Sequence, residues 1–322
     1  MKHISQAKIA VTGSTGEVGG RVAARLAKLG IEQRLVVRDP KRAPQLPGAE
    51  VVQASSLGDA VAMGKALTDI ETLFLVSAHD KLNFAQRSST GVYGLYDRIQ
   101  QQTTAVDVAA AVGVKRIVYL SFQNASRDST FVLARDHFHT EEHIKALGVY
   151  FTFLRMTLYM DLVPVHTSAD GVIRAPAGLG RAAWVARDDI ADVAVAVLTG
   201  SGHDGQTYDI TGPEALTIEE TVEQLSIATG RPIIYQAQTP PEARASRATS
   251  GLAEYEAERL AKTGKRLDDY EVEIWVTHWL QIATGEMSTL SDTVPKLTGH
   301  EAWALADYLR EHPESYQHLI NN

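Results

Sequence analysis

The stretch Lys8–Gly30, KIAVTGSTGEVGGRVAARLAKLG, decides the fold that we expect for this chain. Its short apolar run, Ile9 to Val11, predicts a buried β-strand, and the glycines after it predict a tight turn. An apolar stripe at helical spacing then predicts an amphipathic helix, formed by Val18, Val22, Leu26 and Leu29, with Gly30 as its stop. Strand, glycine-rich turn and helix in this order are typical of a nucleotide-binding βα unit.

The three glycines of the turn, Gly13, Gly16 and Gly19, have separate roles in such a unit. The first permits a turn that a Cβ atom would obstruct, the second lets the backbone approach a diphosphate, and the third lets the helix lie close to the strand. Amides at the start of the helix, together with its dipole, then bind the diphosphate. A turn that merely packs is the alternative. Glu17 lies at the same helix start, and we expect its carboxylate to point away from the phosphates.

Length and composition exclude several classes of protein. With 322 residues, 44% of them hydrophobic, the chain is long enough to bury a large core. No apolar run approaches the ~18 residues that cross a bilayer, and no signal peptide is apparent, so we expect a soluble, cytoplasmic protein with no membrane partner. A net charge of −8 argues against a general nucleic-acid surface, and the absence of cysteine excludes disulfides and thiol nucleophiles.

Apolar runs that alternate with helical patterns predict a parallel sheet with helices on both faces. Further strands are expected at Arg34–Val37, Glu50–Val52, Thr72–Val76, Arg116–Leu120 and Phe151–Leu154, and helices near 59–67, 97–112 and 136–147. This alternation predicts an α/β protein with a Rossmann-type, doubly wound parallel sheet. In such sheets the ligands lie at the carboxyl ends of the strands.

The pattern loosens after about Met156, where we expect a smaller, mainly helical C-terminal lobe that binds substrate. Short strands are expected at Val172–Arg174, Ala183–Val185 and Thr207–Ile210, and helices at 188–198, 217–229, 240–261, 268–284 and 301–310, the first of them begun by an Asp188–Asp189 cap. We therefore assign residues 1–156, continued by 183–212, to a nucleotide-binding domain, and residues 157–182 and 213–322 to the substrate-binding lobe. Its tryptophans are expected in the core: Trp275, Trp279 and Trp303.

Residues 79–96, HDKLNFAQRSSTGVYGLY, form a long link after the fourth strand. Links of this length are usually lids, binding segments or disordered insertions. One interpretation is a substrate lid that carries Phe84, Tyr93 and Tyr96, and the other is a plain insertion. In the first case these rings, with Tyr159, enclose a planar acceptor.

The charge that follows the second strand favours NADP(H) over NAD(H). Arg38 stands about 20 residues after the glycines, at the place where an acid accepts hydrogen bonds from the ribose hydroxyls of NAD. A guanidinium there binds a 2′-phosphate through charge-assisted bonds instead. Asp39 offers an alternative, because a carboxylate turned inward would serve the ribose hydroxyl. A solvated basic turn is the third interpretation.

A set of segments in a fixed order carries a family resemblance: TGSTGEVG, VVRDPKR, LFLVSA, GVKRIVYLSFQNA, RDHFHTEEHIKALG and FTFLRMTLYMD. Over about residues 8–235 the chain resembles the NmrA-like atypical short-chain dehydrogenases/reductases, and within them the type-2 NAD(P)H:quinone oxidoreductases and triphenylmethane reductase. The resemblance implies NADPH at the strand ends. The cofactor-binding positions that it implies are Gly13, Thr15, Gly16, Glu17, Val18, Arg38, Val76, Ser77, Ala78, Ser121, Phe122, Gln123, Met156 and Leu158.

One departure from mainstream short-chain dehydrogenases bears on the chemistry. Those enzymes use a Tyr-x-x-x-Lys pair to exchange a proton with the substrate oxygen, and this chain contains no such pair. His137 and Glu141 stand at the aligned positions. Quinone-type members similarly lack the pair, which implies direct hydride transfer from NADPH to a small planar acceptor such as a quinone. The alternative is a non-catalytic NADP(H)-sensing regulator that binds a protein partner. A monomer or homodimer is expected.

Ser121 and His137 are the candidate catalytic residues. The Ser121 hydroxyl follows the fifth strand, where it either hydrogen-bonds a reducible carbonyl or caps local backbone. His137 either donates a proton to a reduced quinone oxygen or anchors the ribose or the helix packing. His139–His143 reads His-x-x-Glu-His, a pattern of zinc peptidases, but its place in a dinucleotide fold favours a solvated face, and we expect no metal.

Overall fold

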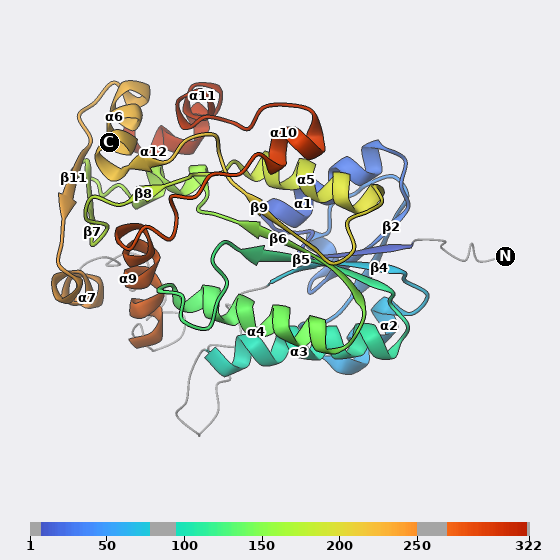
Figure 1. The fold of residues 1–322 in the computed structure, drawn as a ribbon. Helices are drawn as coiled ribbons and strands as arrows, with labels where there is room; N and C mark the ends of the chain where they lie inside the picture. Colours follow the sequence, from blue (N-terminus) through green and yellow to red (C-terminus); the bar gives the residue numbers. More distant parts are fainter. Residues whose placement is uncertain (1–7, 78–94, 250–268, 321–322) are drawn as a thin grey trace.

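The computed structural model describes residues 8–77, 95–249 and 269–320, and it has the expected α/β architecture (Figure 1). Its centre is a seven-stranded sheet in the order β3-β2-β1-β4-β5-β6-β9, with every neighbouring pair parallel. The strands are β1 (Ile9–Thr12), β2 (Gln33–Val37), β3 (Ala49–Gln53), β4 (Thr72–Val76), β5 (Arg116–Phe122), β6 (Tyr150–Met156) and β9 (Gln206–Ile210). The chain order reverses between β1 and β4, which is where doubly wound sheets bind ligands.

Helices cover both faces of this sheet, as Figure 1 shows. On one face α1 (Glu17–Lys28) packs against α5 (Arg187–Thr199). On the other face α3 (Leu95–Ala111) lies between α2 (Ala60–Leu67) and α4 (Val132–Ala146). The Rossmann-type, doubly wound arrangement predicted from the sequence is therefore confirmed.

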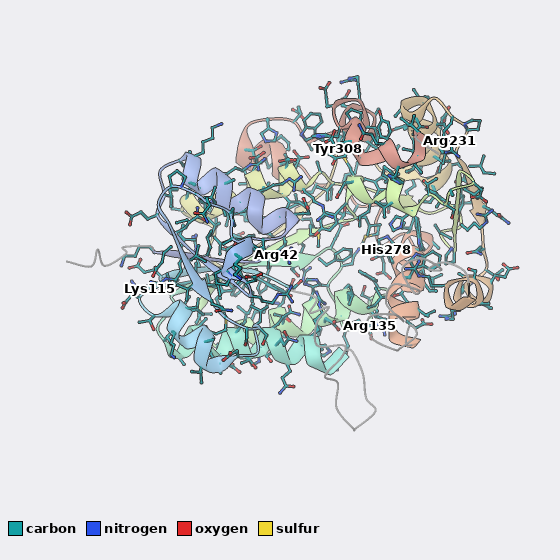
Figure 2. The ribbon with its side chains drawn as sticks, turned by 180° about the vertical axis from the view of Figure 1, so that it is seen from behind. Arg42, Lys115, Arg135, Arg231, His278 and Tyr308 are labelled. Carbon is teal, nitrogen blue, oxygen red and sulfur yellow. The ribbon has the colours of Figure 1, made fainter. Side chains whose placement is uncertain are left out.

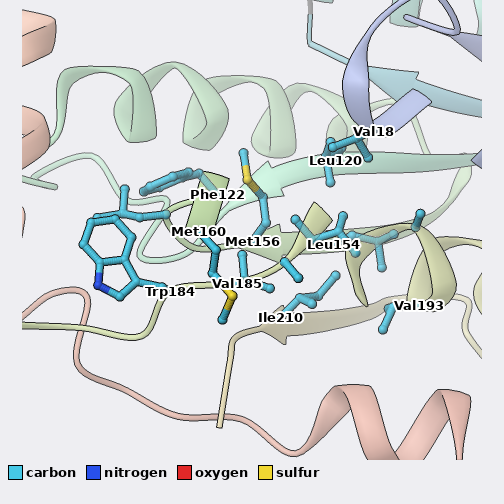
Figure 3. Close-up of a cluster of buried hydrophobic side chains, with 14 of the residues drawn as sticks. Val18, Leu120, Phe122, Leu154, Met156, Met160, Trp184, Val185, Val193 and Ile210 are labelled. Atoms are coloured by element: carbon cyan, nitrogen blue, oxygen red, sulfur yellow. The ribbon is translucent and has the colours of Figure 1, made fainter. Parts of the chain in front are cut away.

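Alternation of side chains along the strands divides the core into two layers. Leu73 and Leu75 of β4 belong to the layer under α2, α3 and α4, whereas Phe74 belongs to the layer under α1 and α5. In this second layer Val18 of α1 lies beside Leu120 of β5 (Figure 3). The glycine-rich turn is thus anchored by a buried side chain one residue into its helix.

The C-terminal part of the chain contains two small sheets besides its helices. β7 (Val172–Ala175) pairs in parallel with β11 (Ile234–Ala237), and β8 (Arg181–Ala182) pairs antiparallel with β10 (Leu216–Thr217). Its helices and 3₁₀ turns are η3 (Met160–Leu162), η4 (Pro164–His166), α6 (Ile218–Thr229), α7 (Pro240–Thr249), α9 (Asp269–Ala283), α10 (Thr293–Thr298), α11 (Leu305–Glu311), η5 (Pro313–Tyr316) and α12 (Gln317–Ile320). Arg231 and Tyr308 lie at this end of the molecule, opposite Lys115 (Figure 2). Every described helix is too short or too polar to traverse a lipid bilayer.

One hydrophobic cluster runs from the central sheet into this C-terminal part. Trp279, predicted to lie in the core, is 1% exposed, and Trp275 and Trp303 are partly buried against the same cluster. Trp184 joins it from the loop after β8 and donates its indole N–H to Thr221 of α6 at 3.0 Å. Because packing is continuous across the proposed boundaries, the division into a nucleotide domain and a substrate lobe stays a prediction.

Two predictions around the start of α5 are wrong, the strand at 183–185 and the Asp188–Asp189 cap, whereas the helix expected at 188–198 is present as α5. Residues 183–185 form no strand, because β8 ends at Ala182 and Val185 makes only an isolated bridge. α5 begins at Arg187 after an Ala186 cap, and the two aspartates lie in its first turn, where the helix dipole favours negative charge.

Two predicted helices also have different bounds. The helix expected at 301–310 begins only at Leu305, because the chain before it is extended and the Trp303 N–H bonds with Asp189 Oδ2 at 2.9 Å. Of the helix expected at 240–261, α7 accounts for the part up to Thr249, and residues 250–261 lie outside the described part of the chain.

Candidate nucleotide-binding site

The glycines shape the turn between β1 and α1. Gly13 has a φ of +65°, in the left-handed region that favours glycine, and its carbonyl oxygen accepts the Gly16 N–H at 2.9 Å. A Cβ atom on Gly19 would lie 2.4 Å from that same Gly13 oxygen, so glycine is needed for α1 to approach β1 this closely. Gly16 is the N-cap of α1 and offers no side-chain oxygen, which leaves the first-turn amides without a side-chain cap.

A cavity of ≈ 310 Å³ opens at this turn, at the carboxyl ends of the strands. Eight of the predicted cofactor-binding residues line it: Gly13, Thr15, Gly16, Glu17, Val18, Arg38, Val76 and Ser77. The other walls include Ala54, Ser56, Leu57, Met63, Gln101, Leu120, Tyr159 and Arg187. Uncapped amides at one point of the cavity, a guanidinium at another and apolar walls between them fit an extended nucleotide that carries phosphates.

Some predicted site residues lie outside the described part of the chain. Ala78, Phe84 and Tyr93 belong to residues 78–94, so both interpretations of that link stay open. Tyr96 lies in α3, and its side chain is not among those described. Tyr159, predicted to contact the acceptor, lines the cavity at the turn between β1 and α1.

Like the buried Ser121, four predicted cofactor residues at or just beyond the ends of β5 and β6 do not line the described cavity: Phe122, Gln123, Met156 and Leu158, all of them buried. The Gln123 side chain donates to the Thr289 carbonyl at 3.2 Å, which ties the end of β5 to the segment after α9. The Phe122 ring lies 5.2 Å from the Phe131 ring, centroid to centroid. For these four residues a contact with the cofactor stays a prediction.

The Glu17 carboxylate forms an ion pair with a cation of its own helix. Its Oε2 lies 2.5 Å from Nη1 of Arg21, one turn along α1, and this hydrogen bond lowers the pKa of Glu17. Arg21 also reaches Asp188 of α5 at 3.3 Å. The carboxylate is therefore paired with a cation beside the amides, and because Glu17 also lines the cavity, its pointing away from the phosphates stays a prediction.

In the turn after β2, the structure distinguishes Arg38 from Asp39, the two residues predicted as alternatives for contact with the ribose. Arg38 lines the cavity, and its carbonyl oxygen accepts the Gln53 side-chain N–H at 2.9 Å. Asp39 does not line it, and its Oδ1 instead accepts the Lys41 N–H at 3.0 Å and caps the 3₁₀ turn η1 (Pro40–Arg42). The geometry favours Arg38 as the group that meets the ribose end of a nucleotide.

Glu141, at the position of the missing catalytic lysine, is a buried structural carboxylate. It has 0% exposure, and Arg155 of β6 bonds both of its oxygens, at 2.9 and 2.6 Å. The bond with Glu141 raises the pKa of Arg155. The buried Ser121 hydroxyl donates to the same carboxylate at 2.6 Å, so its proton is already used, and a hydrogen bond from Ser121 to a substrate stays a prediction.

His137, at the position of the missing catalytic tyrosine, lies in a buried polar chain. Arg98 of α3 donates to its Nε2 at 3.1 Å, and because arginine only donates, the ring proton must lie on Nδ1, which faces the Tyr119 hydroxyl at 2.8 Å. Tyr119 then donates to Gln102 at 2.5 Å. Burial and the charges of Arg98 and Arg155 hold the pKa of His137 well below its usual range. The geometry favours the anchoring alternative over proton donation.

Arg98 connects this chain to the cavity wall. Its guanidinium bonds Ser77 at 2.9 Å and Asp136 at 3.0 Å in addition to His137. Ser77 lines the cavity after β4, so α3 and α4 hold that wall in place through one buried arginine.

The His-x-x-Glu-His segment forms no metal site in the described structure. His143 bonds Asp107 at 2.7 Å and Glu142 pairs with Lys145 at 2.8 Å, both at exposed positions. No group of histidine, aspartate and glutamate side chains among the described residues has the arrangement to hold a metal ion.

Sequence reasoning missed Arg187, which lines the cavity at the start of α5, close enough to Glu17 of α1 for its charge to add to the Arg21 bond in lowering the pKa of Glu17. Its partners, Tyr159 and Asp161, come from a different segment, so no local pattern indicates them. The one available signal is a cation at the first position of a helix, where the dipole disfavours positive charge.

The sequence model of the NmrA-like family matches residues 5–274. The chain belongs to this family. Among curated relatives, the (4-alkanoyl-5-oxo-2,5-dihydrofuran-3-yl)methyl phosphate reductase of Streptomyces griseus is 33% identical over 96% of this chain and 99% of its own length. Quinone oxidoreductase 2 of Escherichia coli is 29% identical over 97% and 99%.

Solved structures agree with this relationship. The NADPH-dependent quinone oxidoreductase of Escherichia coli, in complex with NADPH, is similar with a TM-score of 0.78 and 27% identity over 94% of this chain and 99% of that one. Triphenylmethane reductase of Citrobacter, in complex with NADP(H), is similar with a TM-score of 0.73 and 25% identity over the same shares. Both groups named in the sequence resemblance are thus among its relatives, and these relatives are NAD(P)H-dependent reductases.

Proposed function

We propose that this protein is an NADPH-dependent reductase that transfers hydride directly to a small planar acceptor such as a quinone. The observation that carries the proposal is one cavity that contains both the uncapped start of α1 and Arg38. The relatives support it, because each is a reductase or an oxidoreductase by name and two were solved with NADPH or NADP(H).

The chain supplies binding and orientation rather than acid–base groups. The amides that open α1 bind the diphosphate, Arg38 pairs with the 2′-phosphate, and the wall at Ser77 borders the nicotinamide end. When bound, the reduced nicotinamide supplies the hydride. Both positions of the usual Tyr–Lys pair are occupied by buried, internally bonded residues, His137 at 3% and Glu141 at 0% exposure. A reaction that needs no proton from those positions fits this arrangement.

The acceptor class follows from what the relatives' names have in common. A quinone, a triphenylmethane dye and an acyl dihydrofuranone share three properties: each is conjugated, is electron-poor and can accept hydride, because the conjugated system takes up the electron pair. We propose an acceptor with these three properties for this chain.

Stopped-flow loss of NADPH absorbance with menadione or benzoquinone tests the proposed function. Rapid oxidation that depends on the quinone concentration is expected. Tight NADPH binding without oxidation across a panel of quinones and dyes would favour the non-catalytic sensor instead.

Arg38→Gln should weaken NADPH binding by about 2 kcal/mol, roughly 30-fold, because it removes a charge-assisted bond to the 2′-phosphate. NADH lacks that phosphate, so its affinity should change less than about 3-fold. Fluorescence titration of both nucleotides provides the measurement. Arg181→Gln is the control, since Arg181 pairs with Glu220 at 2.8 Å and does not line the cavity. Equal losses for NADPH and NADH in Arg38→Gln would overturn the assignment.

The pH profile of kcat/KM for menadione should show no step near pH 6.5. His137 stays neutral through that range, because burial and two nearby arginines lower its pKa. Steady-state rates from pH 5.5 to 8.5 check this expectation. A step near pH 6.5 that disappears in His137→Gln would restore His137 as a proton donor.

A further inference from the structure

Arg187 is held in a fixed orientation at the edge of the nucleotide cavity. Its guanidinium carbon lies 4.0 Å from the centroid of the Tyr159 ring, which sets the plane of the group. Its Nε donates to both oxygens of Asp161, at 2.8 and 2.9 Å, which sets the rotation within that plane. The side chain is 15% exposed, so most of it is buried between these partners.

The rest of the guanidinium is available to a ligand. With Nε bonded to Asp161, its two terminal nitrogens have no acceptor among the described residues, and Arg187 lines the cavity. These nitrogens are not among the buried unpartnered atoms, so they face the open cavity, and a planar pair of N–H groups matches two oxygens of one phosphate. The terminal N–H groups of Arg187 are thus held in an orientation that suits a phosphate with two oxygens facing them.

The charges around the cavity place that phosphate near α1. Gly16 and Glu17 line the same cavity as Arg187, and Glu17 is already paired with Arg21. The amides of α1 offer partial positive charge but no full charge, whereas a diphosphate carries two negative charges. Arg187, which lines the same cavity and whose charge reaches Glu17 at the start of α1, supplies a full positive charge beside those amides.

We propose that Arg187 binds the diphosphate of the nucleotide and holds it against the amides of α1. The inference rests on the proposed use of NADPH. Arg187 recognises phosphate oxygens. An acceptor that itself carries a phosphate would be a second source of such oxygens, besides the nucleotide. The inference is distinct from the role of Arg38, because a diphosphate is present in NADPH and NADH alike, whereas the 2′-phosphate is present only in NADPH.

Titrations with three nucleotides separate the two arginines. Arg187→Gln should weaken NADPH and NADH by the same factor, roughly 10- to 100-fold, and leave adenosine 2′-monophosphate unchanged, because that fragment has no diphosphate. Arg38→Gln should give the reverse pattern, with losses for NADPH and the fragment and little change for NADH. Arg181→Gln, a matched arginine in an ion pair outside the cavity, should bind all three as the wild type does.

A second variant keeps the test sound if Arg187→Gln folds poorly. Asp161→Asn retains the Arg187 charge but weakens the bond that orients it, and should weaken both dinucleotides by a few-fold. Thermal melts without ligand check the fold of each variant.

Each outcome decides between the alternatives. Unchanged affinity for NADPH and NADH in Arg187→Gln overturns the inference while the proposed function stands. If nucleotide affinity is unchanged but the KM of Arg187→Gln rises only for phosphorylated acceptors, Arg187 binds the phosphate of the acceptor instead. A wild type that binds neither dinucleotide removes the proposed function, and the inference with it.

Discussion

Gly19→Ala is expected to weaken NADPH binding by about 100-fold, close to 3 kcal/mol. The new Cβ would lie 2.4 Å from the Gly13 oxygen, 2.6 Å from the Gly13 carbonyl carbon and 2.9 Å from the Thr12 oxygen. All three are backbone atoms, so no side chain can rotate away, and α1 has to move away from β1. Because the amides at the start of α1 move with the helix, the diphosphate loses its aligned donors.

Isothermal titration calorimetry with NADPH measures this loss, and Gly64→Ala is the matched control. Gly64 is also a helical glycine, in α2, but its added Cβ would meet only Val108 Cγ1, at an ordinary 3.8 Å. That change should stabilise the fold by roughly 0.5–1 kcal/mol and leave NADPH affinity unaltered. Wild-type affinity in Gly19→Ala would show that α1 does not hold the diphosphate through this close approach.

The part of the fold that rests on local pattern was predictable from the sequence. The run from β1 through the glycines to α1 carries its own signals: an apolar strand, residues that allow positive φ, and a stripe at helical spacing. β2, β4, β5 and the middle of β6 are buried on both faces and likewise appear as apolar runs, whereas the partly exposed edge strand β3 follows from the alternation of strand and helix patterns. The cavity residues that belong to this turn were therefore predictable as well.

What the sequence could not give is the partner of a polar side chain. Asp188 and Asp189 looked like a helix cap, a local role, but Asp188 bonds Arg25 of α1 at 2.6 Å and Asp189 accepts the Trp303 N–H at 2.9 Å. These partners lie 163 and 114 residues away in the chain. Residue type and spacing do not specify such contacts.

The same limit applies to the candidate catalytic residues. His137 has the usual residue type for proton transfer, and only the fold shows that Arg98 and Tyr119 bond both of its ring nitrogens. Arg187 is the opposite case, because its sequence context suggests an ordinary helix residue while the fold presents it to the cavity.

Ionisation of the Asp189 carboxyl group should destabilise the folded protein at neutral pH. Measured against a variant that cannot ionise at this position, the wild type should therefore be less stable at neutral pH than in weak acid. Its side chain has 0% exposure, and beyond the bond from Trp303 its Oδ1 has no hydrogen-bond partner among the described residues. Burial raises the pKa of Asp189 from 3.8 to about 6, and the nearby Asp192 and Asp188 add to that rise, against the Trp303 bond and the charge of His300.

The direction of this pH effect on stability follows from which state, folded or unfolded, keeps the Asp189 proton. Between pH 3.8 and about 6 the folded protein keeps a proton that the unfolded chain has released, so the stability from this group is present below that window and is lost as pH rises through it. A shift of about two pKa units corresponds to about 3 kcal/mol. Asp189→Asn cannot ionise and still accepts the Trp303 N–H, so its stability relative to wild type should increase by that amount between pH 4 and pH 8.

Urea unfolding of both proteins at pH 4, 6 and 8 measures the difference, and using the difference cancels the titration of every other group. His166 and His278, for example, act in the opposite direction, because burial lowers their pKa values to about 3 and about 4. Asp188→Asn is the control of opposite sign: burial raises the pKa of Asp188, but the bonds and charges of Arg25 and Arg21 outweigh it and lower that pKa. That variant should therefore lose most stability at neutral pH. A constant difference between Asp189→Asn and wild type from pH 4 to pH 8 would mean that the Asp189 carboxylate ionises as in water, and that its burial at the start of α5 costs the fold nothing.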